Sequence, residues 1–123
     1  MADYIPKFTP GSAVTFTTSA AVAGGQAVEI TGARTVGPAG AASKKYIGVA
    51  AFSAASGEKV TVHLPGQVQR IKTAGAITAG ATVQTGAAGT VAAGTAAPIG
   101  VALTTAATGE LVEVLDSLAL VVA

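Results

Sequence analysis

The chain has 123 residues, half of them hydrophobic, and its seven Lys and Arg residues against six Asp and Glu give a formal net charge of +1. This length suits one domain, and such an even charge balance excludes the clustered basic surface that binding to nucleic-acid phosphates requires. There is no Cys, which excludes disulfides and thiolate chemistry, and no apolar run approaches the roughly 20 residues of a membrane-spanning helix.

The first 18 residues differ in character from the rest of the chain. Pro6 and Pro10 favour extended backbone, and the alternating residues 14–18 are typical of a short strand. We therefore predict an extended N-terminal arm over residues 1–18, followed by a single β domain over residues 19–123. The early acid and the prolines are unlike a secretory leader, so we expect synthesis in the cytoplasm.

The β domain contains a duplicated unit. Residues 47–62 return 52 residues later as residues 99–114, with Ile-Gly-Val-Ala, then Ala-Ala-Ser/Thr-Gly-Glu, then two alternating valines in both copies. Upstream, residues 25–29 match residues 80–84 more weakly, and here the two copies lie 55 residues apart instead of 52. The loop before Ile-Gly-Val-Ala is therefore three residues longer in the first copy. We place the two pseudo-repeats at about residues 20–64 and 75–116.

Both copies have the sequence pattern of β structure. Residues 59–64 and 111–115 alternate with a period of two, as half-buried strands do. Gly interrupts the Ala-rich tracts too often for long helices, although the two Ala-Ala-Ser/Thr-Gly-Glu segments each allow one helical turn ended by Gly. The sequence predicts eight or more short strands in an all-β fold, either a compact β-barrel or a β-tulip-like sandwich built from the two pseudo-repeats.

Few residues in the chain are suited to catalysis. The single histidine, His63, has Leu115 at its place in the second copy, so we assign it to the surface or to an interface. Glu58 and Glu110 follow Gly in both copies. They would either pair as acid and base across a cleft or each satisfy backbone N–H groups in the turn before a strand, and we favour the second. We expect a protein that is not an enzyme and uses no cofactor and no metal.

The glycine spacing and strand texture resemble those of a known family. The residues that carry the resemblance are YIGVA (46–50), SGEKVTV (56–62), GQV (66–68), AITAG (76–80) and PIGVA (98–102), with Gly109 and Glu110. Together they resemble the tailed-bacteriophage capsid decoration proteins, also called cement or head-stabilising proteins, over roughly residues 20–116. The resemblance implies a homotrimer that is made in the host cytoplasm, binds the major capsid protein on the outer capsid surface of the virion and stabilises contacts between capsid subunits.

The predicted arm is the candidate capsid-binding segment. It supplies aromatic anchors that the rest of the chain lacks, and it would lie across a capsid subunit or add to an exposed sheet edge. The candidate residues are Tyr4, Ile5, Pro6, Lys7 and Phe8. The alternative is an N-terminus that is disordered or packs on its own domain. The apolar residues 118–122 favour a final strand or part of a subunit interface.

Three other functions stay open at this stage. One is a receptor- or carbohydrate-binding β module on a virion surface, although only five aromatic residues are available to form a sugar platform. Another is a different structural component of the virion, associated with the tail or a fibre. The least favoured is a small hydrolase or lyase that uses Glu58 or Glu110. Neither nucleic acid nor a membrane is expected as a direct partner.

Overall fold

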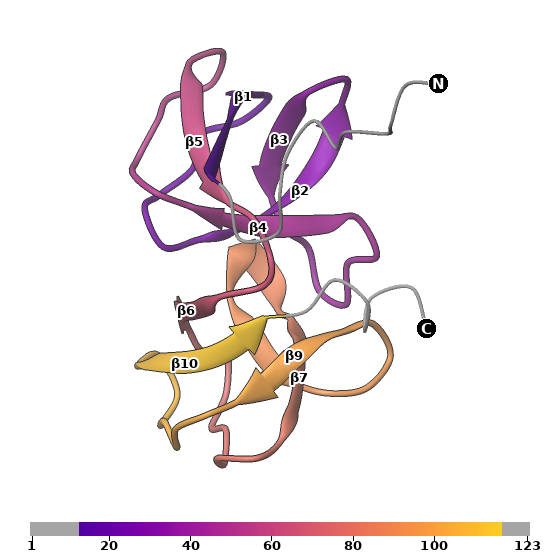
Figure 1. The fold of residues 1–123 in the computed structure, drawn as a ribbon, viewed down its shortest axis with the longest axis vertical. Coiled ribbons are helices and arrows are strands. Elements are labelled where there is room, and N and C mark those ends of the chain that lie inside the picture. The colour runs from indigo at the N-terminus through magenta and orange to yellow at the C-terminus, as the bar shows by residue number, and fades with distance from the viewer. Residues whose placement is uncertain (1–12, 117–123) are drawn as a thin grey trace, which may run out of the picture.

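A computed structural model describes residues 13–116, which form two five-stranded sheets stacked along the long axis of the molecule (Figure 1). The first sheet contains β1 (Ala13–Thr18), β2 (Ala27–Gly32), β3 (Thr35–Pro38), β4 (Tyr46–Ala50) and β5 (Lys59–His63). The second contains β6 (Val68–Lys72), β7 (Thr82–Thr85), β8 (Val91–Ala93), β9 (Pro98–Ala102) and β10 (Leu111–Asp116). The predicted all-β fold with more than eight strands is confirmed.

The two sheets repeat the same strand order. The first is a closed barrel, β1-β3-β2-β4-β5, in which β1 pairs in parallel with β3 and antiparallel with β5. The second follows the order β6-β10-β9-β7-β8, and a parallel bridge between Thr73 and Val91 joins the end of β6 to β8. That bridge lies 55 residues after the pairing of Thr18 with Val36. We call the two sheets the first and the second barrel.

The structural repeat is longer than the sequence repeat. Strand β1 lies within the segment that the sequence predicted as an arm, and its counterpart β6 lies between the two predicted pseudo-repeats. Among the inward residues of these strands, Phe16 of β1 matches the buried Ile71 of β6, but Val14 matches the buried Gln69. Because little sequence is shared, the first strand of each unit was not recognisable as part of the repeat.

The two Ala-Ala-Ser/Thr-Gly-Glu segments, for which the sequence allowed one helical turn each, are turns but are not helical. Each Ala-Ala-Ser/Thr-Gly-Glu segment is a hydrogen-bonded turn, closed by Glu58 N donating to Ala55 O and by Glu110 N donating to Ala107 O, both at 3.1 Å. Its glycine has a positive φ, +86° in the first copy and +83° in the second. The one helical segment among residues 13–116 is the three-residue η1 (Ala87–Gly89). Within this range no helix is long and apolar enough to span a membrane.

Alternating side chains build two cores. In β10, for example, Val112 and Val114 point inward and are fully buried, whereas Leu111 and Leu115 point outward. One core cluster fills the first barrel. The other fills the second barrel and also takes in four residues of the first, namely Ala27, Ala39, Tyr46 and Val49. The two barrels therefore share a core where they meet.

The longer loop of the first copy connects the barrels. Thr85 of β7 is fully buried. Its hydroxyl donates a hydrogen bond to Gly40 O (2.8 Å), and its hydroxyl oxygen accepts one from the N–H of Ser43 (2.8 Å). The backbone oxygen of Thr85 accepts the N–H of Ala42 (2.7 Å), and Gly89 N donates to Ala39 O (2.8 Å). The extra loop length that the sequence revealed thus serves the contact between the barrels. We call residues 39–45 the clasp loop.

Thr85→Val tests the clasp loop. The change keeps the shape of the side chain but leaves Gly40 O and Ser43 N without their buried partner, so we expect the free energy of unfolding to fall by about 2 kcal/mol. Urea unfolding followed by circular dichroism measures the loss. Thr82→Val, a half-buried change on the same strand, is the matched control. An equal loss in both variants would show that the hydroxyl of Thr85 has no special role.

Candidate functional site

The predicted capsid-binding residues Tyr4, Ile5, Pro6, Lys7 and Phe8 lie outside the described residues, as does the apolar stretch 118–122. Their roles stay predictions. The described chain begins at Ala13, the first residue of β1, where it pairs with His63 of β5. The polypeptide therefore enters the first barrel at this strand pair.

The two repeated glutamates hold turns. Glu58 Oε1 accepts the N–H of Ala55 at 2.9 Å, and Glu110 Oε1 accepts the N–H of Ala107 at 3.0 Å. Each carboxylate spans three residues of its own turn, directly before β5 or β10. The predicted structural role of both carboxylates is confirmed.

His63 has the surroundings of a strand residue on the outside of a barrel. It is half-buried on β5, shares its face with Thr61 and Lys59, and pairs with Ala13 and Val49. Its backbone oxygen accepts a hydrogen bond from Gln69 Nε2 (3.1 Å). Within residues 13–116, His, Cys, Asp and Glu side chains form no group of three or more that could hold a metal ion.

A buried polar pair joins the barrels. The hydroxyl of Tyr46 on β4 donates a hydrogen bond of 2.5 Å to Oδ2 of Asp116 at the end of β10, and both residues are 1% exposed. Burial raises the pKa of the Tyr46 phenol above its ordinary value, and the neighbouring Asp116 raises it further. The phenol is therefore held in its neutral, proton-donating form.

Sequence reasoning missed this pair. The available signal was a difference between the copies, since Pro98 stands at the place of Tyr46 and Leu64 at the place of Asp116. A polar residue in one copy and an apolar residue in the other indicates a contact that the repeat itself does not need. Here that contact is the junction of the two barrels.

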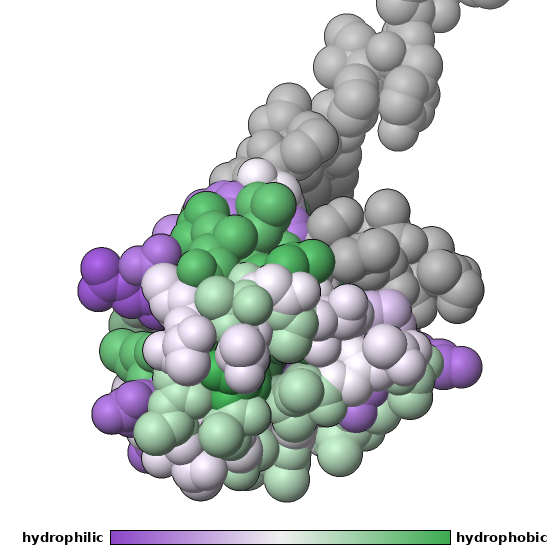
Figure 2. Space-filling view, turned by 90° about the horizontal axis from the view of Figure 1, so that it is seen from below, coloured by the Kyte–Doolittle hydropathy of each residue, from purple (hydrophilic) through white to green (hydrophobic). Residues whose placement is uncertain are grey.

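Exposed large apolar side chains gather on the second barrel. Figure 2 views the molecule from the second-barrel end and shows strongly apolar residues collected at one edge, with hydrophilic residues beside them. Four of the five large apolar side chains that are exposed within residues 13–116 belong to this barrel. They are Val68, Leu103, Leu111 and Leu115, whereas Phe52 belongs to the first barrel.

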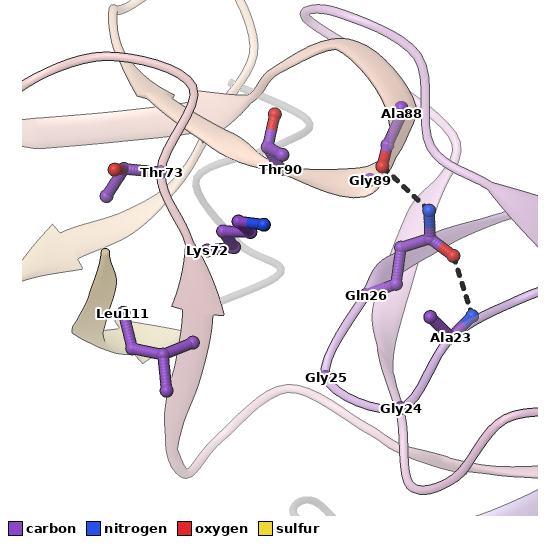
Figure 3. Close-up of a pocket in the computed structure, with 10 residues that line it drawn as sticks. All are labelled: Ala23, Gly24, Gly25, Gln26, Lys72, Thr73, Ala88, Gly89, Thr90 and Leu111. Carbon is purple, nitrogen blue, oxygen red and sulfur yellow. Dashed lines mark hydrogen bonds between the residues drawn. The ribbon is translucent and has the colours of Figure 1, made fainter. Parts of the chain in front are cut away.

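A groove of about 450 Å³ lies between the barrels. Gln26 reaches across it and donates to Ala88 O (2.7 Å), while its own amide oxygen accepts the N–H of Ala23 (2.9 Å) (Figure 3). The rest of the lining consists of Gly and Ala residues with Thr73 and Thr90, Lys72 as the cation and Leu111 at the side of the second barrel. Because it offers no carboxylate, imidazole or thiol, the groove has the character of a contact surface.

Comparisons with known proteins agree with the predicted family. The sequence model of a family described as phage cement protein matches residues 8–115. Among solved structures, the head fibre gp8.5 N base of bacteriophage phi29 has a similar fold, with a TM-score of 0.71 and 20% sequence identity over 86% of this chain and 93% of that chain. No curated protein matches the sequence. Since the family match covers nearly all of the chain, this protein belongs to the phage cement protein family.

Proposed function

We propose that this chain is a non-enzymatic decoration protein that binds the outer surface of a phage head. There it contacts the major capsid protein as a homotrimer and stabilises the contacts between capsid subunits. The observation that carries the proposal is the family match over residues 8–115, which gives the chain a structural role in the phage head. Three linked copies would bind more tightly than one, because each further contact forms at a high effective concentration.

The structure supports a mechanical role in two ways. The outer strand surfaces of the first barrel carry mostly small residues, those of the second barrel carry exposed apolar side chains, and charged residues make up only 11% of the chain, so little desolvation is needed when a partner covers them. The barrels are also joined by the clasp loop and by the buried pair of Tyr46 and Asp116, which makes the described part of the chain suitable for carrying load.

The test mixes the purified full chain with undecorated, expanded heads. We expect saturable co-sedimentation and a higher temperature of head disruption, measured by light scattering and DNA release. Tyr4→Ala/Phe8→Ala should weaken binding at least tenfold if the arm supplies the anchors, because buried aromatic anchors dominate such contacts. Phe52→Ala removes an aromatic that is 49% exposed on the first barrel and is the matched control. Absence of binding to expanded heads would refute the decoration role.

A second candidate is another structural component of the virion, associated with the tail or a fibre. The observation that favours it is the fold shared with a head fibre base. Cryo-electron microscopy of complete particles separates the two functions. Density for the double barrel distributed over the capsid supports decoration, and density confined to a tail or fibre supports the second candidate.

A further inference from the structure

The outer face of β6, β10 and β9 carries several exposed apolar side chains, with Arg70, Lys72 and Glu113 among them. Leu115 lies in register between Val68 on one side and Val101 on the other. Leu103 N donates to Glu113 O (2.7 Å), so Leu103 lies beside Glu113, which is the next outward-facing residue of β10. Leu111 is the outward-facing residue of β10 on the other side of Glu113. We call Val68, Val101, Leu103, Leu111 and Leu115 the apolar face.

Its exposure is large for side chains of this kind. Leu111 is 60% exposed, Val68 51%, Leu115 49% and Leu103 45%. A contiguous apolar patch rimmed by polar groups marks an interaction site on a soluble protein more often than an accidental surface. Figure 2 shows such a patch on this end of the molecule, next to hydrophilic residues.

The first barrel provides an internal comparison. Four of the five equivalent positions carry small or polar residues, and the fifth, that of Val101, carries Val49, even though the strands and their register are the same. In place of Val68, Leu115, Leu103 and Leu111 the first barrel has Ala13, His63, Ala51 and Lys59. The repeat therefore folds without large apolar residues at these four positions, and packing within the barrel does not explain Val68, Leu103, Leu111 and Leu115.

Two opposite charges lie within the apolar face. Arg70 of β6 and Glu113 of β10 are cross-strand partners in the row next to Leu115 and Val68. Arg70 is exposed and Glu113 is half-buried. Arg70 therefore lies at the β6 edge of the face, as does the exposed Lys72, whereas Glu113 lies at its centre on β10. Around a three-fold axis, each copy can place its Arg70 opposite Glu113 of the next copy.

We propose that the apolar face is where copies of this chain contact one another. The proposal rests on the self-association part of the proposed function and names the surface responsible for it. A second copy fits this surface because it brings the matching apolar residues and the complementary charge pair at once. The net charge of +1 leaves little repulsion between copies.

The first test gives the apolar face the residues of the first barrel. Val68→Ala/Leu115→His should weaken self-association at least tenfold, measured by sedimentation velocity and mass photometry on the full chain. Thermal unfolding at a concentration where the chain is monomeric should change little, because the equivalent positions of the first barrel hold these same residues. Phe52→Ala, which removes a comparably exposed side chain from the first barrel, should leave association unchanged.

The second test reverses the charges. Arg70→Glu alone and Glu113→Arg alone should each weaken self-association, since each creates like charges across the contact. Arg70→Glu/Glu113→Arg in one chain should restore it, because every contact then again joins opposite charges. A wild-type chain that stays monomeric, a Val68→Ala/Leu115→His variant that associates normally, or an Arg70→Glu/Glu113→Arg variant that does not recover would overturn the proposal.

Binding to heads is measured separately, so the two proposals fail in different ways. A chain that binds heads as a monomer contradicts self-association through the apolar face and leaves the decoration role standing. A chain that self-associates but does not bind heads contradicts the decoration role alone. Loss of head binding in Val68→Ala/Leu115→His while self-association is retained would assign the apolar face to a capsid protein and overturn the proposal.

Discussion

Tyr46→Phe is expected to lower the free energy of unfolding by about 3 kcal/mol, because it removes a hydrogen bond to a buried carboxyl group. Tyr46 and Asp116 belong to different barrels and are almost fully buried where the barrels meet. The loss should appear in urea unfolding of the purified chain as a lower transition midpoint. We expect the second barrel to be affected with the first, because Tyr46 also belongs to the core that the barrels share.

A double variant provides the control for this prediction. Asp116→Leu introduces the residue that the first copy has at the equivalent place, Leu64. The loss of unfolding free energy in Tyr46→Phe/Asp116→Leu should be smaller than the sum of the losses in the two single variants, because neither polar group is then left buried without its partner. Strictly additive losses would contradict a direct interaction between the two side chains.

The same pair predicts a loss of stability at alkaline pH. In the unfolded chain the pKa of a tyrosine is about 10, whereas burial and Asp116 raise the pKa of Tyr46 in the folded protein. Above about pH 10 the unfolded state releases a proton that the folded state keeps, so the free energy of unfolding falls by about 1.4 kcal/mol per pH unit. Below that pH the stabilisation is fully present. Urea unfolding between about pH 9 and 11 should show this slope in the wild type and not in Tyr46→Phe.

Gly48→Ala and Gly100→Ala are the second pair of changes with a large expected effect. A Cβ at Gly48 would lie 2.2 Å from the backbone oxygen of His63, and φ at Gly48 is +155°. A Cβ at Gly100 would lie 2.2 Å from the backbone oxygen of Leu115. Neither obstacle is a flexible side chain, so the strands themselves must move apart. We expect each change to cost about 3 kcal/mol or more.

Gly75→Ala is the matched control for these glycines. A Cβ at Gly75 meets no atom within 4 Å, so its stability should stay near that of the wild type. Circular dichroism and thermal unfolding of the three variants measure the difference. Wild-type stability of Gly48→Ala and Gly100→Ala would mean that β4 and β5, or β9 and β10, do not approach as closely as described.

These glycines also explain why the duplication was visible. Ile-Gly-Val-Ala recurs because each barrel needs one residue without a side chain where its fourth strand meets its fifth. Glu58 and Glu110 recur because each turn needs an acceptor for a backbone N–H group. Residues that answer a requirement of the unit itself repeat with it, so the sequence alone predicted the β repeat and the turns before β5 and β10. The family was indicated by the resemblance of these residues to the cement proteins.

The first strand of each unit could not be found in this way. What β1 and β6 share is an inward-facing position, held by Phe16 in one and Ile71 in the other. Their pairing with β5 and β10 joins residues that are between 39 and 50 apart in the chain. The alternation of apolar and polar residues specifies which side chains face inward. It does not specify which strand lies alongside.

From its sequence alone, this protein was predicted to be an all-β duplication, because periodicity, turn glycines and turn carboxylates obey local rules. Its structural role in a phage particle was implied only by the resemblance of its residues to the cement proteins. The tertiary structure decided how the copies differ. The clasp loop, the pair of Tyr46 and Asp116, and the apolar face each depend on positions where the second copy departs from the first. Such departures acquire meaning only when the three-dimensional structure shows which distant residues they meet.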